Sequence, residues 1–487
     1  MLFNSYIFIF LFLPLVLLGY YGLNHFKQNK LAIVYVIGMS FWFYGYNSIE
    51  YLCILVFSIL INYLLVELMS RLQKQEVRRI LLLLGLVWNI GALFYYKYFD
   101  FFVENFNKVF HTDIAFLELV LPLGISFYTF QQLSYVIDSY KRDCEKYSLV
   151  EYAAYVSFFP QLIAGPIVYH DELIPQLRDE ANKKLNFDNM AKGIYAFSLG
   201  LAKKVLLADT FSRLVAVGYY DIYKLNATST LLVMVCYSLQ IYFDFSGYCD
   251  MAYGIGYMFN IKLPVNFNSP YKAASITEFW DRWHMTLTRF FTKYVYIPLG
   301  GSRRGKCRTY LNIFIVFAVS GLWHGANWTF IVWGCMNGIA KVLDRMFHKV
   351  VEKIPRLAGI ILTFTFSTFA WSLFRSKSVA HARVLWSNFA KKPWGEIYPP
   401  FIETFDELIE AEVLQHFNIG GILTIYPWLL LVLFVVGVTI ASMTMRNTQE
   451  KVAVMKLTTK KVLVVIILLV WSVLSLSQVS EFLYFNF

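Results

Sequence analysis

Long apolar segments recur along almost the whole chain, and they constrain the fold more than any other feature. A helix that crosses the hydrocarbon core of a membrane needs about 20 mainly apolar residues. Of the 487 residues, 58% are hydrophobic and only 15% are charged, whereas about a quarter of a soluble domain is charged. The sequence therefore predicts an all-α polytopic membrane protein with about 11–12 transmembrane helices. The expected spans are residues 6–23, 31–47, 49–69, 80–99, 116–137, 192–217, 228–257, 358–375, 425–444 and 462–479, with two further crossings inside 310–343.

Lysine and arginine gather in alternate short loops, and basic loops stay on the cytoplasmic side of a membrane. Twelve crossings with both termini outside satisfy this pattern, which predicts a multi-pass membrane protein with its basic loops in the cytoplasm. The net charge of +11 is then explained by the loops, so no nucleic-acid partner is expected. The basic loops predicted inside begin at Lys27, Arg71, Lys141, Arg303, Arg345 and Arg446.

The six cysteines are scattered and include no Cys-x-x-Cys pair. A disulfide framework or a zinc site would require paired spacings. We therefore expect neither, and no bound metal. The cysteines are Cys53, Cys144, Cys236, Cys249, Cys307 and Cys335.

His324 lies inside the apolar stretch 310–342, which contains no Asp, Glu, Lys or Arg before Lys341. An ionisable side chain at membrane depth is a functional hypothesis by default. Removal from water disfavours imidazolium and leaves a neutral nitrogen that can accept a proton, which is what a general base needs. The structural alternative is a histidine that hydrogen-bonds between packed helices.

Two carboxylates, Asp244 and Asp250, lie in the apolar segment 228–257 without a basic residue nearby in the sequence. Each costs roughly 2.5–3.5 kcal/mol at the centre of a bilayer. They therefore need partners or water. One interpretation is that they bind loop amides or helix N-termini as interhelical contacts; the other is that they shape a cavity.

A polar and aromatic segment, Glu278-Phe-Trp-Asp-Arg-Trp-His284, is too polar to span and too aromatic for a free loop. It predicts a re-entrant or interfacial segment with His284 as a candidate site residue. Aromatic belts at the membrane surface also account for Trp280 and Trp283. They do not account for His284 so near the charged residues Glu278, Asp281 and Arg282. Downstream, the Gly300-Gly301 pair and the basic residues after it can hold a phosphorylated ligand, or they merely reflect positive-inside bias. These basic residues are Arg303, Arg304 and Lys306.

Residues 152–168 are apolar but contain Pro160, Gly165 and Pro166, which interrupt a helix repeatedly. A re-entrant loop fits this segment better than a crossing.

Five motifs, in this order, resemble the membrane-bound O-acyltransferase (MBOAT) superfamily, and the closest likeness is to its bacterial alginate O-acetyltransferase type. The resemblance extends from the N-terminus to the aromatic last six residues. The motifs are Phe159-Pro-Gln-Leu-Ile-Ala-Gly-Pro166, Tyr242-Phe-Asp-Phe-Ser-Gly-Tyr248, Glu278-Phe-Trp-Asp-Arg-Trp-His284, Tyr296-Ile-Pro-Leu-Gly-Gly301 and Ser320-Gly-Leu-Trp-His-Gly-Ala326.

The resemblance implies an enzyme that takes an acyl group, with acetyl as the expected one, from cytoplasmic acyl-CoA through a membrane-embedded tunnel. The donor is a substrate, and no bound cofactor is expected. His324 matches the invariant histidine of the family, and His284 its second polar position. His324 would act as general base, while His284 or the amides near Gly321 and Gly325 would steady the oxyanion. Arg303, Arg304, Lys306 and Trp283 would lie at the acyl-CoA entrance.

The chain departs from the usual pattern at two places beside this entrance. Asp281 stands where a basic residue is common, and Thr292-Lys293 stands where Arg-Asp is common. Neither change removes a histidine, but both put the transfer of donor specificity in doubt.

The last six residues contain Tyr484. In the D-alanylation branch, which this chain resembles, a similar tail tyrosine is proposed to carry the acyl group. The alternative is an aromatic anchor at the membrane surface. The family also implies a separate extracytoplasmic acyltransferase or esterase-like partner and a polysaccharide acceptor, so that polysaccharide, membrane lipid and this partner are the expected contacts.

Two other classes of function remain open at this stage. A transporter of polysaccharide or lipid-linked sugar would share the hydrophobicity and the buried carboxylates, although inverted halves with interrupted helices are not found. A membrane haem protein would use His284 and His324 as axial ligands. No linker separates domains, so we expect one membrane-embedded domain over 1–487, with N-terminal helices in 1–137, a catalytic core in 150–345, and C-terminal helices with the aromatic tail in 358–487.

Overall fold

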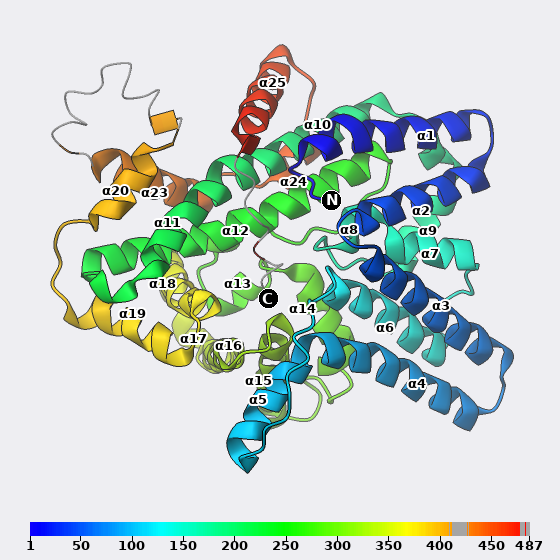
Figure 1. The fold of residues 1–487 in the computed structure, drawn as a ribbon, viewed down its shortest axis with the longest axis horizontal. Coiled ribbons are helices and arrows are strands. Elements are labelled where there is room, and N and C mark those ends of the chain that lie inside the picture. Colours follow the sequence, from blue (N-terminus) through cyan, green and yellow to red (C-terminus); the bar gives the residue numbers. More distant parts are fainter. Residues whose placement is uncertain (409, 412–425, 427, 478–482, 484–487) are drawn as a thin grey trace. The chain divides into compact units, whose positions relative to one another are not determined.

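The computed structural model describes residues 1–408, 410, 411, 426, 428–477 and 483, and the regular structure in this part is helical throughout (Figure 1). Five of the described helical segments are long and apolar enough to cross a membrane. They confirm the predicted all-α membrane class, while the number of eleven to twelve crossings stays a prediction. The five segments are Phe8–His25, Ile49–Arg71, Gln75–Phe110, Ala227–Met258 and Arg356–Arg375.

The chain forms two compact units, and each is made of three separate segments of the sequence. Unit 1 consists of residues 1–201, 248–265 and 452–479, and unit 2 consists of residues 202–247, 266–451 and 480–487. The long helix α12 (Ala227–Met258) contributes its first part to unit 2 and its last part to unit 1.

Unit 1 contains most of the N-terminal helices. Within it, α3, α4 and α6 pack against one another (Figure 1). The helices of this unit are α1 (Leu13–His25), α2 (Asn29–Gly45), α3 (Ile49–Arg71), α4 (Gln75–Leu93), α5 (Phe99–Phe110), α6 (Ile125–Lys141), α7 (Leu149–Ser157), α8 (Phe159–Leu162), α9 (His170–Arg178), α10 (Phe187–Ala202), α25 (Thr459–Leu474) and the last two residues of α24 (Thr448–Ala453).

Buried amides join α3, α4 and α6 by side-chain hydrogen bonds. Asn62 of α3 donates to Gln132 of α6 at 2.7 Å, and Asn89 of α4 donates to Asn62 at 2.6 Å. All three side chains are buried. Apolar packing alone discriminates poorly between helices in a membrane, and such interhelical hydrogen bonds hold a defined arrangement.

The expected span at 116–137 is wrong for residues 116–124. Helix α6 begins only at Ile125, and residues 112–122 are not helical. Pro122 lacks an amide hydrogen, and Gly124 adopts the left-handed conformation with φ of 72°. These two residues end the extended segment and turn the chain into the helix.

The expected interruption of residues 152–168 is confirmed. Helix α7 ends at Ser157, the four-residue helix α8 follows, and the chain is irregular from Ile163 onward. A Cβ atom on Gly165 would lie 2.4 Å from the Cα of Gln161. Only glycine therefore permits the tight return after α8.

Unit 2 contains the segments that carry both candidate histidines. Helices α15 and α16 run side by side as a hairpin (Figure 1). The helices of this unit are α11 (Asp209–Tyr220), the first part of α12, α13 (Ile276–Trp280), α14 (Met285–Phe291), α15 (Lys306–His324), α16 (Trp328–Met346), α17 (His348–Val351), α18 (Arg356–Arg375), α19 (Val379–Lys391), α20 (Pro399–Asp406) and α23 (Trp428–Thr444).

Candidate active site

The α15–α16 hairpin depends on two facing glycines. A Cβ atom on Gly321 would lie 2.4 Å from the carbonyl oxygen of Phe330 and 3.0 Å from the Cα of Gly334. Small residues of this kind let two helix backbones approach closely in a membrane. The turn is short, because α15 ends at His324 and Asn327 caps α16 by accepting from the Thr329 amide at 3.0 Å. The two predicted crossings within 310–343 thus meet beside His324.

His324 is the last residue of α15, and its side chain is enclosed by aromatic rings. Only 4% of the residue is exposed. Its ring centroid lies 4.9 Å from that of Trp323, 5.1 Å from Phe374 and 5.2 Å from Trp333, the last in an edge-on contact. The expectation that this histidine is shielded from solvent is therefore met.

His284 occupies the turn between α13 and α14. Its backbone adopts φ of 45° and ψ of 50°, the left-handed region that costs a residue with a Cβ atom roughly 1–3 kcal/mol. The side chain is buried, and its ring meets Phe245 edge-on at 4.8 Å. Burial lowers the pKa of His284 to about 3, an effect that a backbone hydrogen bond opposes only in part. The imidazole is therefore neutral at physiological pH.

The structure brings the two predicted histidines together. The ring centroids of His284 and His324 lie 6.4 Å apart, and Trp323 is in ring contact with both. They come from segments 40 residues apart in the sequence, so only the tertiary fold creates the pair.

Backbone pairing holds the turn that carries His284. The amide of Asn268 donates to the carbonyl of Arg282 at 2.9 Å, and the amide of Met285 donates to the carbonyl of Asn266 at 2.9 Å. Two short stretches, residues 266–268 and 282–285, thus lie side by side. This pairing accounts for the persistence of the unfavourable backbone conformation at His284.

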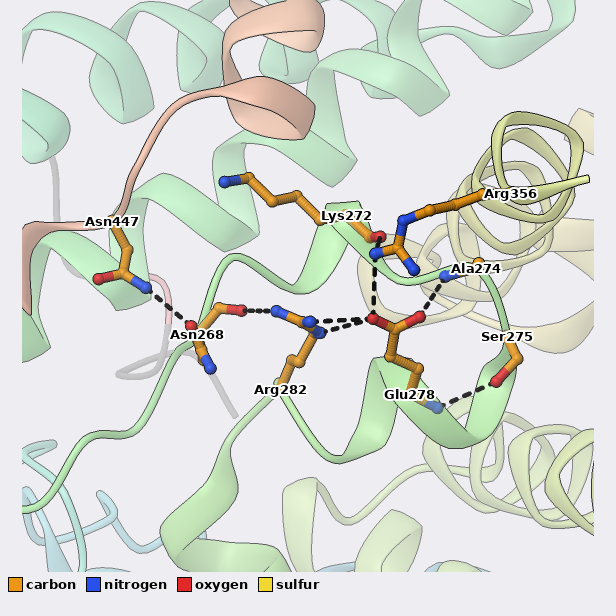
Figure 2. Close-up of polar contacts among 8 residues, drawn as sticks. All are labelled: Asn268, Lys272, Ala274, Ser275, Glu278, Arg282, Arg356 and Asn447. Carbon is orange, nitrogen blue, oxygen red and sulfur yellow. Dashed lines mark hydrogen bonds and ion pairs between the residues drawn. The ribbon is translucent and has the colours of Figure 1, made fainter. Parts of the chain in front are cut away.

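Figure 2 shows how side chains secure the same turn from outside. Glu278 accepts hydrogen bonds from Arg282 at 2.9 Å and from Arg356 of α18 at 3.3 Å. Arg282 also donates to the carbonyl of Asn268 at 3.0 Å, and Asn447 donates to the side chain of Asn268 at 2.8 Å. Helix α13 is therefore tied both to the start of α18 and to the segment before α24.

A cavity of about 180 Å³ opens beside His284. Its walls come from α13, α14, α15, α16 and the π-helical segment Thr292–Tyr296, and such π-bulges occur frequently at functional sites. A more open cavity of about 360 Å³ shares Trp280, Thr288 and Thr292 with it, so the two are adjacent. The residues that line the smaller cavity are Trp280, His284, Leu287, Thr288, Phe291, Thr292, Tyr296, Ile313, Val316, Phe317, Ser320, Lys341 and Arg345.

The positive charge of the smaller cavity comes from two residues that we did not predict as site residues from the sequence. Lys341 and Arg345 of α16 line it, and Lys341 lies 3.7 Å from the carboxylate of Asp281. In the sequence these two residues look like an ordinary basic helix end. Only their spacing of four, which places them on one helix face, gives a signal.

The basic residues that we did expect at the entrance lie elsewhere in unit 2. Arg303, Arg304 and Lys306 are exposed at the turn before α15 and at its first residue, outside the lining of either cavity. The amides of Gly300 and Gly301 donate to backbone carbonyls within the turn, at 2.9 Å each. These amides are therefore engaged in holding the turn.

Trp283 is buried rather than placed at an entrance. Its ring stacks on Phe279 at 5.6 Å and contacts Trp371 at 4.7 Å. It lies outside the lining of the smaller cavity.

Asp244 has a charged partner that the local sequence did not reveal. Lys204, in the π-helical segment Lys203–Ala208, places its ammonium group 2.6 Å from Asp244 and 2.9 Å from Asp209. The amide of Leu483 donates to the other carboxylate oxygen of Asp244 at 2.8 Å. Asp244 thus contacts a backbone amide and a lysine that we had missed. Asp250 is buried in the part of α12 that belongs to unit 1.

Tyr484, the proposed acyl carrier, lies outside the described residues. Its neighbour Leu483 is described and buried, and the hydrogen bond to Asp244 places it in unit 2.

Comparison with known proteins places this site in a family. The family model for "MBOAT, membrane-bound O-acyltransferase family" matches residues 39–380. The chain is 42% identical over 412 residues to a peptidoglycan O-acetyltransferase of Helicobacter pylori, covering 78% of each chain. It is 35% identical over 398 residues to a Pseudomonas aeruginosa protein named "Probable alginate O-acetylase AlgI", covering 80% of this chain and 74% of the relative.

A more distant relative matches a smaller part of the chain. A teichoic acid D-alanyltransferase of Bacillus subtilis is 27% identical over 281 residues, which cover 54% of this chain and 71% of the relative. The family model spans both His284 and His324. With its helical fold and its apolar spanning segments, the chain is an O-acyltransferase that belongs to the membrane-bound O-acyltransferase family.

Proposed function

We propose that the protein transfers an acetyl group from cytoplasmic acetyl-CoA toward an extracytoplasmic polysaccharide, directly or through a partner protein. The observation that carries the proposal is the pair of buried histidines, whose rings lie 6.4 Å apart. His284 lines a cavity that Lys341 and Arg345 also line. A titratable pair in a concave, mainly apolar site is the arrangement expected of a catalytic centre.

In the proposed reaction, His324 is the general base. An acceptor hydroxyl attacks the thioester carbonyl, and His324 takes the hydroxyl proton. The new C–O bond forms as the C–S bond breaks, and the proton passes to the departing thiolate of coenzyme A. Assistance of this kind contributes typically 10²–10⁴-fold in rate. The aromatic enclosure of His324 favours the neutral form that this role requires.

The size of the cavity supports a short acyl chain. At about 180 Å³ it is smaller than a pocket for a drug-sized ligand, which measures about 300–1,000 Å³. It accommodates the thioester end of acetyl-CoA but not its nucleotide. Lys341 and Arg345 are placed to meet phosphate groups of the donor, whose binding by basic side chains is charge-assisted.

The names of the relatives support a cell-envelope or secreted polysaccharide as the acceptor. The relative with 42% identity is named for peptidoglycan and the one with 35% identity for alginate. Peptidoglycan is therefore the first acceptor to test. We further propose a location in the bacterial cytoplasmic membrane with both termini outside, and an extracytoplasmic partner that completes delivery to the sugar.

The deciding experiment uses inverted membrane vesicles and labelled acetyl-CoA. We expect wild-type vesicles to incorporate label and His324→Ala vesicles of equal protein content to lose at least 99% of it. His348→Ala is the matched control, because His348 is exposed on α17 and outside both cavities. Equal transfer by wild type and His324→Ala would refute the general-base assignment.

Tyr484 requires its own test, because the tail is proposed either to carry the acyl group or to anchor the chain. Under the carrier hypothesis, Tyr484→Phe abolishes transfer at normal protein level, and mass spectrometry of the wild-type tail detects an acetylated tyrosine. Tyr6→Phe, which alters an exposed tyrosine near the N-terminus, is the control. Unchanged transfer by Tyr484→Phe would leave only the anchoring role.

The alternative functions make different predictions. Transport would move sugar without consumption of acetyl-CoA, and a haem protein would absorb visible light after purification. The relatives described above carry acyltransferase names, which favours the proposed reaction over both.

A further inference from the structure

Asn266 makes a cluster of contacts directly beside His284. Its side-chain oxygen accepts from the hydroxyl of Thr286 at 2.9 Å, from the amide of Thr286 at 3.3 Å and from Nδ1 of His284 at 3.1 Å. Only 1% of Asn266 is exposed. Three contacts thus converge on one buried atom.

These contacts determine which nitrogen of His284 carries the proton. The amide of Thr286 can only donate, so the atom that it meets must be the carbonyl oxygen of Asn266 rather than its NH₂ group. An amide oxygen can only accept, so Nδ1 of His284 must carry a hydrogen. A neutral imidazole has one N–H group, and its lone pair is therefore on Nε2.

Neutrality of the ring is supported independently. Burial lowers the pKa of His284, as described above. The other titratable or charged side chains that line the cavity are Tyr296, Lys341 and Arg345. His324 is outside this lining, and its ring centroid lies 6.4 Å from that of His284.

We propose that Asn266 is a positioning residue for acyl transfer, which holds His284 as the Nδ1–H tautomer so that Nε2 acts toward the substrate as a hydrogen-bond acceptor. The inference rests on the proposed function. It replaces the expectation that His284 donates to the oxyanion, because a neutral ring with hydrogen on Nδ1 has no hydrogen to donate from Nε2. Stabilisation of the oxyanion then falls to other donors, such as backbone amides.

The backbone supports the same role. His284 is held in the left-handed region, and the amide of Met285 donates to the carbonyl of Asn266 at 2.9 Å. Asn266 thus contacts this turn through both its main chain and its side chain. Groups that orient a metal-binding histidine typically change metal affinity or activity 10–100-fold when removed, and we expect an effect of the same order here.

The first test reads the tautomer directly. Wild-type protein labelled with ¹⁵N-histidine is compared by NMR with His284→Gln, which assigns the His284 signals among the eight histidines. We expect a protonated Nδ1 and an unprotonated Nε2 at pH 7. A hydrogen on Nε2 in the wild type would overturn the proposal, whatever the activity of the protein.

The second test separates positioning from folding. Asn266→Ala should lower kcat at least tenfold and leave KM for acetyl-CoA within about twofold. Asn388→Ala is the control. Asn388 is a buried asparagine of α19 in unit 2, and its side chain donates to the carbonyl of Ile222. A kcat for Asn266→Ala within twofold of this control would refute the role.

Asn266→Asp provides a readout that a merely structural residue would not change. The carboxylate keeps all three acceptor contacts but favours imidazolium, which raises the pKa of His284. We expect the acidic limb of the kcat profile at least one pH unit higher than in the wild type, with near-normal kcat at alkaline pH. An unshifted profile would overturn the proposal. Absence of acetyl transfer by the wild type would refute the proposed function instead, and the NMR result distinguishes this case.

Discussion

The ammonium group of Lys204 lies 2.6 Å from the carboxylate of Asp244, and both side chains are buried, with exposed fractions of 4% and 3%. The same carboxylate accepts the amide of Leu483, in the tail of the chain. Ion pairs in such surroundings are costly to break, because removal of one partner leaves an uncompensated buried charge. Through Asp244, this pair therefore connects the segment of Lys204 and helix α12 to Leu483.

Removal of Lys204 should destabilise the protein strongly. Lys204→Met leaves Asp209 and Asp244 without their shared cation, and we expect a loss of about 3–5 kcal/mol in the free energy of unfolding. Thermal unfolding in detergent measures it. The control is Lys224→Met, whose ion pair with Asp221 lies at the surface and should contribute little to stability. Equal losses in the two variants would show that burial adds nothing to the Lys204 pair.

Donor affinity should depend on α16 rather than on the turn before α15. Lys341→Ala and Arg345→Ala should each raise KM for acetyl-CoA about tenfold with kcat within twofold, because a charge-assisted hydrogen bond contributes about 1.5–3 kcal/mol. Steady-state kinetics in detergent or vesicles provides the measurement. Arg304→Ala is the comparison. If it alone raised KM, the donor would enter past the exposed basic turn, as the sequence had indicated.

The α15–α16 hairpin should not tolerate a side chain at its closest approach. Gly321→Ala places a methyl group 2.4 Å from the carbonyl oxygen of Phe330, and we expect a loss of about 1–3 kcal/mol in stability, with reduced activity because His324 is three residues away. Gly437→Ala on α23 has open space around the new methyl group and should be neutral or slightly stabilising. The prediction fails if both variants unfold at the wild-type temperature.

His284 should make stability depend on pH. Its pKa is about 3 in the folded protein and about 6.5 when unfolded, so the unfolded state binds the extra proton between these values. Stability should therefore be constant for this group above pH 6.5 and fall by roughly 1.4 kcal/mol per pH unit below it. Unfolding of wild type and His284→Gln from pH 7.5 to 5 measures this contribution. Parallel curves for the two proteins would contradict a neutral buried imidazole.

Local patterns sufficed for much of the fold. Runs of apolar residues indicated helical spans, and the prolines and glycine at 160–166 indicated the interruption that follows α7. The span at 116–137 failed because its apolar composition resembles that of a helix, although Pro122 and Gly124 interrupt it. The apolar composition of a segment indicates that it is buried in lipid or protein. Where its helix begins or ends depends on single residues such as proline and glycine.

The sequence by itself determined that this chain is a helical membrane protein and that His284 and His324 are its candidate site residues, because hydrophobicity and motifs are properties of neighbouring residues. The tertiary structure alone decided that Lys204 neutralises Asp244, that Lys341 lines the cavity and that Asn266 orients His284. These partners lie 18 to 57 positions away from the residues that they serve in the chain. A buried charge or ring needs a partner within a few ångströms, and only the folded chain selects which residue fills that place.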